Sequence, residues 1–243
     1  MSPQPPRILA IETSGAAGSI AVARGETLCI ETPLDASTRH AADLMAAIDR
    51  AWRSQDWASD SLAECHVSIG PGSFTGLRVA VTTARSLALA LSARLVAVPS
   101  LDVVARSALT HLDEGEYLAA MLDAKRGQVF AALYQRRAEE MTPLSGPHLI
   151  EPEMWLAGLP RPCRITGEGI AYHAAACARS GLPLIPPAAR IPHARDVYRL
   201  GWVLAQAGRY ASTRDLTPLY VRRPEAEELW ERRQAESPAP HRL

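Results

Sequence analysis

At residues 66–93 the chain reads HVSIGPGSFTGLRVAVTTARSLALALSA. The apolar run at 67–69 is typical of a short buried strand. A loop rich in Gly, Pro and Ser follows at 70–76, and a run of small and aliphatic residues then predicts a helix over 76–93. Such a loop either presents helix amides to an anion or fixes the angle at which the helix leaves the sheet.

The loop matches neither of the common phosphate-binding motifs. No Lys followed by Ser or Thr comes after Gly76, so the loop is not a Walker A motif. Thr75 stands where a dinucleotide-binding fingerprint has its third glycine, and the strand around Val96 offers no acidic residue for a ribose. We therefore expect a strand-to-helix corner, with anion binding as the alternative.

Composition indicates an ordinary globular protein. The chain has 243 residues, of which 47% are hydrophobic and 21% charged, which suits one large or two small domains. Its 26 basic residues balance 26 acidic ones, so a protein whose main task is to hold nucleic acid is not indicated. The four cysteines are scattered without metal-binding spacing, which predicts free thiols in a reducing compartment.

We expect no targeting segment from the sequence. The first residues, MSPQPPRILAIE, lack the apolar core of a signal peptide. No uncharged apolar run reaches the roughly 18 residues needed to cross a bilayer. We therefore expect a cytoplasmic protein that does not associate with membranes.

Two segments share one pattern, which indicates a weak internal duplication. They read ILAIETSGAAGSIAVA at 8–23 and LAAMLDAKRGQVFAALY at 118–134. Each is a strand, a turn that begins with an acidic residue (Glu12 or Asp123), and a second strand rich in Ala and Val. The pattern predicts an α/β protein of two lobes, each opening with a hairpin. The expected division is residues 1–102, residues 103–223 and an exposed tail at 224–243.

Periodicity predicts the remaining elements. Further strands are expected at 27–32, 95–98 and 163–166, and helices at 38–53, 101–112, 170–179 and 194–208. Ser37 or Thr38 would cap the first helix. Residues 135–162 are rich in proline and charge and are expected to be irregular.

The helix predicted at 76–93 carries small residues at every fourth position. A stripe of this kind lets another helix approach closely. A second apolar face on the same helix means that it is either fully buried or part of an interface. We favour an interface, with packing on the protein's own sheet as the alternative. The stripe consists of Gly76, Ala80, Ala84 and Ala88, and the second face of Leu77, Val81, Leu87 and Leu91.

Candidate catalytic and metal-binding residues are few. Glu12 and Asp123 could act as catalytic carboxylates or bind magnesium, but two-metal sites need more converging acids, and acids at hairpin turns are commonly turn formers. His173 and Cys177 are one helical turn apart, yet two ligands do not make a zinc site. We predict no catalytic residue and no metal.

Four stretches resemble the TsaB family, also called YeaZ: ILAIETSGAAGSIAV, SIGPGSFTGLRVAVTTARSLALAL, LDAKRGQVFAALY and LTPLYVRR. The resemblance extends over most of residues 7–223. It implies the two-lobed fold of actin, sugar kinases and Hsp70-type ATPases, with duplicated ribonuclease H-like lobes. Members of the family were long labelled glycoprotease-like. The metal-binding histidine pair of the related catalytic protein TsaD is absent here, because Leu44 stands where a second histidine would follow His40.

The resemblance also implies a role. It suggests a non-catalytic subunit of the bacterial complex that makes threonylcarbamoyladenosine in tRNA. In that family TsaB pairs with TsaD through helices of its N-terminal lobe, and the ATPase TsaE joins the pair. The complex transfers threonylcarbamoyl to the adenosine next to the anticodon, so tRNA would be reached only through the complex. Without its partner, the apolar surface would favour a homodimer.

The resemblance places the partner interface on the helices at 38–53 and 76–93 and on the loop before the second. The implied interface residues are Leu44, Ile48, Gly70, Pro71, Gly72, Ser73, Phe74, Thr75, Gly76, Arg78, Ala80, Ala84, Leu87 and Ala88. The implied nucleotide-binding residues are Glu12, Thr13, Ser14 and Asp123. The family usually has Asp at the position of Glu12, which puts the nucleotide site in doubt. No intrinsic cofactor is expected, and ATP or ADP with magnesium at the interface of the complex stays open.

Two other functions stay open. A stand-alone ATP-dependent enzyme or peptidase of the same fold would require converging acids or a metal site. A nucleotide sensor would bind ADP or ATP with the loop at 70–76, at a junction between subunits.

Overall fold

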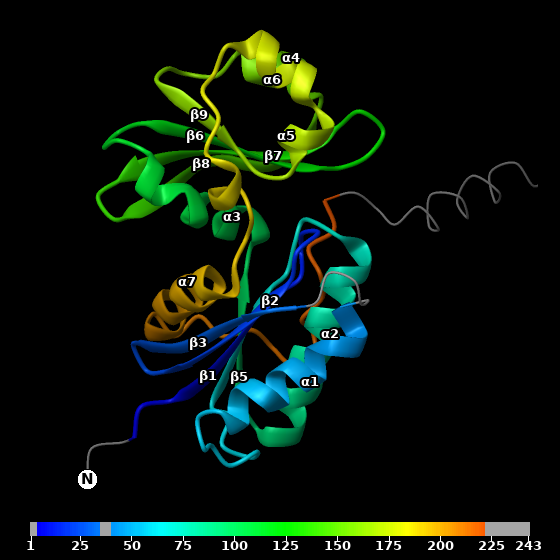
Figure 1. Ribbon diagram of the computed structural model, residues 1–243, viewed down its shortest axis with the longest axis vertical. Coiled ribbons are helices and arrows are strands. Elements are labelled where there is room, and N and C mark those ends of the chain that lie inside the picture. Colours follow the sequence, from blue (N-terminus) through cyan, green and yellow to red (C-terminus); the bar gives the residue numbers. More distant parts are fainter. Residues whose placement is uncertain (1–3, 35–39, 222–243) are drawn as a thin grey trace, which may run out of the picture.

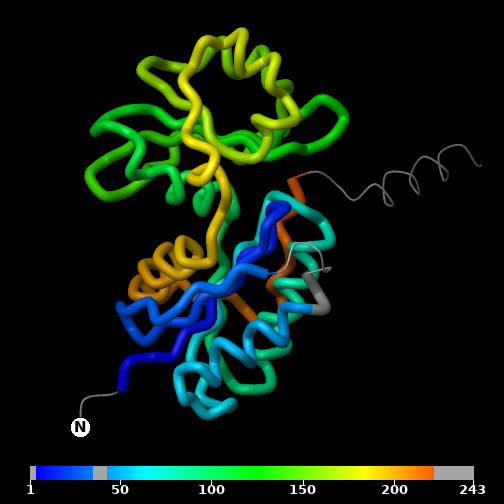
Figure 2. Tube along the Cα trace, in the orientation of Figure 1, coloured from blue at the N-terminus to red at the C-terminus, as the bar shows by residue number. Residues whose placement is uncertain are grey.

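The computed structural model describes residues 4–34 and 40–221, which form two lobes (Figure 1). Each lobe is a β-sheet with helices on both faces. Figure 2 shows that the chain crosses between the lobes twice, once after β5 (Arg94–Val98) and once before α7 (Ala194–Gln206). The predicted two-lobed α/β fold is thus confirmed.

The first lobe is built on a five-stranded sheet. Its strands are β1 (Arg7–Glu12), β2 (Ser19–Arg24), β3 (Thr27–Pro33), β4 (Glu64–Ser68) and β5, and its first two helices are α1 (His40–Arg53) and α2 (Phe74–Leu91). The strand order is β3-β2-β1-β4-β5, with β1 antiparallel to β2 and parallel to β4. Figure 1 shows α1 and α2 on one face of this sheet and α7 on the other.

Alternation along the strands gives the first sheet two apolar faces. Leu9 and Ile11 pack with the residues of α1 and α2, whereas Ile8 and Ala10 pack with those of α7. All four side chains are fully buried. Because helices cover the sheet on both sides, the inner positions of β1 and β2 are apolar on both faces, whereas the central strand β4 also carries buried polar residues.

The second lobe is built on a four-stranded sheet with the order β8-β7-β6-β9. Its elements are α3 (Ser100–Ala108), a short 3-10 helix (Leu109–His111), β6 (Tyr117–Asp123), β7 (Val129–Arg137), β8 (Glu140–Ile150), α4 (Pro152–Ala157), β9 (Cys163–Thr166), α5 (Gly169–Tyr172), α6 (Ala174–Ser180) and a second 3-10 helix (Pro187–Ala189). Leu101 and Val104 of α3 pack on one face, and Leu156 of α4 and Ile170 of α5 pack on the other. Over the described ranges of both lobes, no helix has the length and apolar character needed to cross a membrane.

The two lobes repeat one arrangement. β6 is antiparallel to β7 and parallel to β9, just as β1 is antiparallel to β2 and parallel to β4. Glu12 ends β1 and Asp123 ends β6, so the two hairpin acids occupy the same place in their lobes. The internal duplication inferred from the sequence is therefore a repeat of strand order and direction.

The chain returns to the first lobe after the second is complete. Helix α7 packs on β1, β2 and β5, and its Tyr198 hydroxyl donates a hydrogen bond of 2.8 Å to the Gly25 carbonyl. Ala211 then pairs with Leu95 at the edge of the first sheet. Residues 194–219 thus lie with the first lobe, whereas the expected division placed them in the second.

Two predicted elements differ from the structure. Residues 135–162 are not irregular, because β7 extends to Arg137 and is followed by β8 and α4. Strand β8 accommodates Pro143 and Pro147 because it is an edge strand, where a proline need not donate to the ladder. The helix expected at 170–179 is divided into α5 and α6 at His173. The expected caps at 37 and 38 and the tail at 224–243 lie outside the described residues.

The cysteines differ in burial, which predicts their reactivity. Cys29 is exposed on β3, whereas Cys65, Cys163 and Cys177 are buried. Burial raises the pKa of the Cys65 thiol to about 12 and that of Cys163 to about 11, so neither forms thiolate readily. We expect one thiol of the native protein to react with Ellman's reagent at about pH 8, and all four to react in denaturant. Fast reaction of a Cys29→Ser variant would contradict this assignment.

Candidate functional site

The loop between β4 and α2 is held against the β1–β2 turn by backbone contacts. The Ser73 amide donates to the Ser14 carbonyl at 2.7 Å, and the Thr13 hydroxyl donates to the Gly76 carbonyl at 2.8 Å. A Cβ at Gly76 would collide with the Thr13 carbonyl, and one at Gly72 with the Ser14 carbonyl. These two glycines are therefore required by close backbone approach, and the loop serves as the expected strand-to-helix corner.

Helix α2 begins two residues earlier than the sequence predicts. Ser73 is its N-cap, and the Ser73 side chain accepts a hydrogen bond of 3.3 Å from the Gly76 amide. Phe74 and Thr75, assigned to the loop from the sequence, form the first turn of the helix. The Ser73 cap was the signal in the sequence that would have found this boundary.

The segment after α7 runs back along α2 and fixes its start. The Leu219 amide donates to the Ile69 carbonyl at 2.7 Å, directly before the loop. The Arg78 guanidinium lies 4.0 Å from the centre of the Phe74 ring and donates to the Tyr220 hydroxyl at 3.2 Å. The LTPLYVRR motif thus contributes Leu219 and Tyr220 to the same corner as the GPGSFTG loop.

The small-residue stripe of α2 does not lie on a surface. Ala80, Ala84 and Ala88 are buried in the core of the first lobe, and Gly76 is buried against the β1–β2 turn. The expectation that the stripe contacts a partner is therefore wrong, because small residues here let α2 approach its own sheet. Leu44 of α1 is buried in the same core, so it too is unavailable to a partner.

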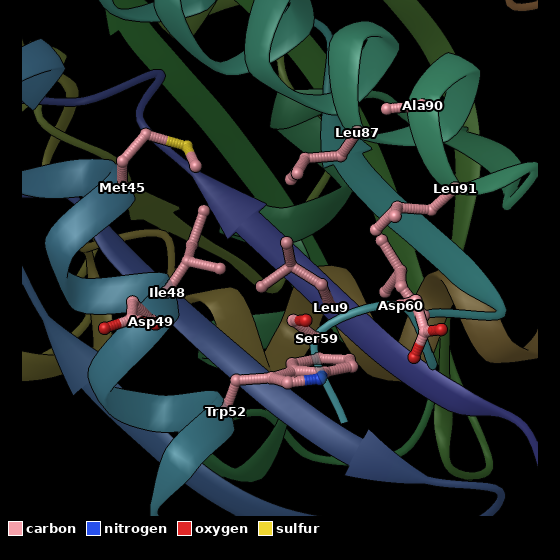
Figure 3. Close-up of a pocket in the computed structure, with 11 residues that line it drawn as sticks. Leu9, Met45, Ile48, Asp49, Trp52, Ser59, Asp60, Leu87, Ala90 and Leu91 are labelled. Carbon is pink, nitrogen blue, oxygen red and sulfur yellow. The ribbon is translucent and has the colours of Figure 1, made fainter. Parts of the chain in front are cut away.

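An apolar groove opens between α1 and α2 (Figure 3). Its volume is about 310 Å³, with Leu9 at its floor and the side chains of both helices directed into it. Met45 is 51% exposed at its edge. We call this the α1–α2 groove. Its lining is Leu9, Met45, Ile48, Asp49, Trp52, Ser59, Asp60, Leu62, Leu87, Ala90 and Leu91.

The sequence placed only two groove residues, Ile48 and Leu87, in the interface. It missed Met45, Trp52 and Leu91, which share the groove with them. The signal was present, since these residues recur at helical spacing on α1 and on the second apolar face of α2. Which of two apolar faces stays open cannot be read from periodicity.

A second cluster lies at the junction of the lobes. Glu12 is fully buried, and its Oε1 accepts a hydrogen bond of 2.5 Å from the Ser14 amide. Burial raises the pKa of Glu12, and the negative charge of Glu168 raises it further. The sequence did not single out Glu168, whose Oε2 accepts a hydrogen bond of 3.2 Å from the Ala16 amide across the junction.

Asp123 is an ion-pair partner on the second lobe. Its carboxylate lies 2.8 Å from Lys125 Nζ and 3.3 Å from His173 Nε2. Burial acts against the ionised form, but these partners outweigh it and hold the pKa of Asp123 below its ordinary value. Cys177, which lies one turn after His173, packs instead in the core of the lobe. Within the described ranges, no group of His, Cys, Asp or Glu side chains is arranged to hold a metal ion.

Each lobe has the same strand arrangement and carries one hairpin acid, Glu12 or Asp123, at the end of its first strand. These duplicated lobes define a protein of the two-lobed actin-like class. The family model described as "TsaD: tRNA N6-adenosine threonylcarbamoyltransferase" matches residues 31–230. The TsaB protein of Bacillus subtilis is 32% identical over 169 residues, covering 68% of this chain and 72% of that protein. The chain therefore belongs to this family, and within it to the TsaB proteins.

Two further comparisons agree with this assignment. The TsaB protein of Escherichia coli is 25% identical over 228 residues, covering 89% of this chain and 94% of that protein. The solved structure of YeaZ from Pseudomonas aeruginosa superposes with a TM-score of 0.76 at 24% identity, covering 88% of this chain and all of that one. The likeness to the solved structure shows the fold alone.

The junction does not suit the nucleotide phosphates that the fold class implies. The amides that could bind a phosphate already donate to carboxylates: Ser14 to Glu12, Ala16 to Glu168, and Lys125 to Asp123. A polyphosphate would therefore meet three carboxyl groups and no free amide at these positions. Of the expected residues, Glu12 and Asp123 are close enough to Glu168 for their charges to act on one another, whereas the Thr13 hydroxyl is bonded to Gly76.

The close backbone approach at Gly76 yields a test of stability. We expect Gly76→Ala to lower the free energy of unfolding by about 2–3 kcal/mol, because the methyl group must displace α2 from the β1–β2 turn. Urea denaturation measures the change. The matched control is Gly158→Ala, where the nearest atom to a Cβ is 3.8 Å away and little change is expected. Equal stability of the two variants would show that the approach does not constrain the fold.

Proposed function

We propose that this protein is a non-catalytic subunit in the biosynthesis of tRNA threonylcarbamoyladenosine, and that it binds a TsaD-type catalytic protein through the α1–α2 groove. Membership of the TsaB family supports the pathway. The observation that supports the role is the groove itself, an apolar surface on two helices that no described part of the chain covers. Such a surface on a soluble protein marks an interaction site.

The chemistry of the groove favours a helix as the element that binds there. The floor and both walls are apolar, so an amphipathic helix could insert a row of side chains between α1 and α2. Asp49 and Asp60 lie at the groove, which favours basic residues beside the apolar row of the partner. The expected interface residues Phe74, Thr75 and Arg78 are exposed at the start of α2, outside the lining of the groove.

The other components follow from this role. The described residues hold no cluster suited to metal catalysis, and the whole sequence carries equal numbers of basic and acidic residues. Transfer to the adenosine and most of the tRNA contact are therefore assigned to the partner, with TsaE joining the pair. A nucleotide bound at the interface between the two subunits is part of this proposal. The junction of the lobes within this chain does not offer such a nucleotide a site.

Groove substitutions test the proposal. Met45→Asp and Ala90→Asp change exposed side chains on the two walls, so the fold should survive. We expect each to weaken binding to the TsaD protein of the same organism at least about tenfold, since each places a charge in an apolar contact. Isothermal titration calorimetry measures the affinity, and tRNA modification by the reconstituted complex should fall in parallel. Unchanged affinity for both variants would reject the groove as the interface.

Met154→Asp is the matched control, because Met154 is 77% exposed on α4 of the other lobe. It should bind like the unmodified protein. The purified chain alone should show neither peptidase activity nor ATP turnover. Robust turnover that survives further purification would favour a stand-alone enzyme of the same fold.

A further inference from the structure

Glu168 of the second lobe contacts the β1–β2 turn of the first lobe. It lies in the turn between β9 and α5, where Gly167 and Gly169 pack so closely on β6 that a Cβ at either would collide with the Met121 carbonyl. This packing fixes the turn and directs Glu168 to the first lobe. Its Oε2 accepts the Ala16 amide at 3.2 Å and lies 3.4 Å from the Cβ position of Gly15.

Glu12 lies on the other side of this contact with half of its carboxyl group unpaired. Oε1 accepts the Ser14 amide, but Oε2 is buried without a hydrogen-bond partner. The hydroxyls of Ser14 and Ser68 lie beside it and are also buried and unpaired. The groups that favour ionised Glu12 are all neutral, and no described cation forms an ion pair with it. A buried carboxyl in such surroundings is stable in its neutral form.

Neighbouring charges act on the pKa of Glu168 in both directions. Burial raises the pKa of Glu168 and the Asp123 carboxylate raises it further, while the Ala16 amide and the Lys125 ammonium act against the rise. Asp123 stays ionised because Lys125 and His173 face it. Glu168 therefore lies between one acid that is firmly ionised and another, Glu12, that is buried.

We propose that Glu168 is a latch between the lobes, a carboxyl group bound to the β1–β2 turn, and that a single proton on Glu12 controls whether the latch stays closed. With Glu12 neutral, the Glu168 carboxylate can remain beside it and accept the Ala16 amide. With Glu12 ionised, two carboxylates are bound to amides of the same turn, those of Ser14 and Ala16, and they repel each other. Separation of the lobes relieves this repulsion and lets water reach both acids.

The direction of the pH dependence follows from linkage. The pKa values of both glutamates are raised in the closed form, so the closed form binds protons more tightly than an opened form in which water reaches the acids. The closed state is therefore most stable below the ordinary pKa of glutamate. Its advantage is lost as the pH rises through the raised pKa of the pair. The latch depends on neither TsaD nor the α1–α2 groove, so it goes beyond the proposed function and can fail separately from it.

The distance between the lobes tests the latch. Spin labels on the native Cys29 of β3 and on Met154→Cys of α4 place one exposed probe on each lobe. Electron–electron double resonance then gives the distance distribution at about pH 5 and about pH 8, on either side of the range in which a buried carboxyl titrates. We expect one narrow distribution at the lower pH, and a broader or displaced one at the higher pH.

Three variants decide the assignment. Glu12→Gln keeps an oxygen for the Ser14 amide but cannot ionise, so its distribution should change less between the two pH values than that of the unmodified protein. Glu168→Ala removes the acceptor and should give the displaced distribution at both. Glu153→Gln, a change of an exposed acid on α4, should behave like the unmodified protein. A distribution of the unmodified protein that ignores pH, or a Glu12→Gln variant that responds to pH as the unmodified protein does, would overturn the proposal.

Discussion

The approach of the β1–β2 turn to the loop before α2 is the constraint on which the first lobe depends. The Thr13 and Ser14 carbonyls occupy the space that side chains at positions 76 and 72 would need. Only glycine allows two backbones to come this close, so the start and direction of α2 are set by the absence of two Cβ atoms. Every later contact of α2 with the sheet extends from this point.

The same constraint produces both candidate sites. Because α2 starts at a fixed place, Ala80, Ala84 and Ala88 pack in the core, whereas Leu87 and Leu91 line the α1–α2 groove. The turn that anchors α2 also carries Glu12 at the end of β1, so one short turn connects the acids at the junction with the start of α2. A movement of the turn would therefore reach both the junction and the helix that forms one wall of the groove.

The sequence predicted the strands, the duplication and the family because these depend on patterns within single segments of the chain. Strands, the hairpin acids, the duplication and the family follow from periodicity and from motifs within single segments. The stripe on α2 was misassigned because burial depends on which neighbour lies opposite, and small residues suit both a sheet and a partner helix. Residues 135–162 were misassigned because Pro143 and Pro147 indicate a loop unless the strand is known to be at an edge.

Glu168 shows a second limit of sequence reading. It lies 152 positions from Ala16, and its role comes from a turn whose direction is set by backbone packing on Met121. Its neighbours in the chain carry no sign of this contact. The ion pair of Asp123 with His173 likewise joins residues that are distant in the sequence. Spacing along the chain had instead suggested His173 and Cys177 as a pair of metal ligands.

The position of α7 has a consequence for how the chain acquires its structure during synthesis. The ribosome releases β1 to β5 first, yet one face of their sheet stays uncovered until Val197 and Tyr198 arrive from beyond the whole second lobe. Contacts between such distant segments slow folding, and an uncovered apolar sheet face is prone to aggregation while it waits. A nascent chain stalled before residue 194 would therefore expose Ile8, Ala10 and Val96, which makes the N-terminal lobe a natural client for a chaperone until the last helix is made.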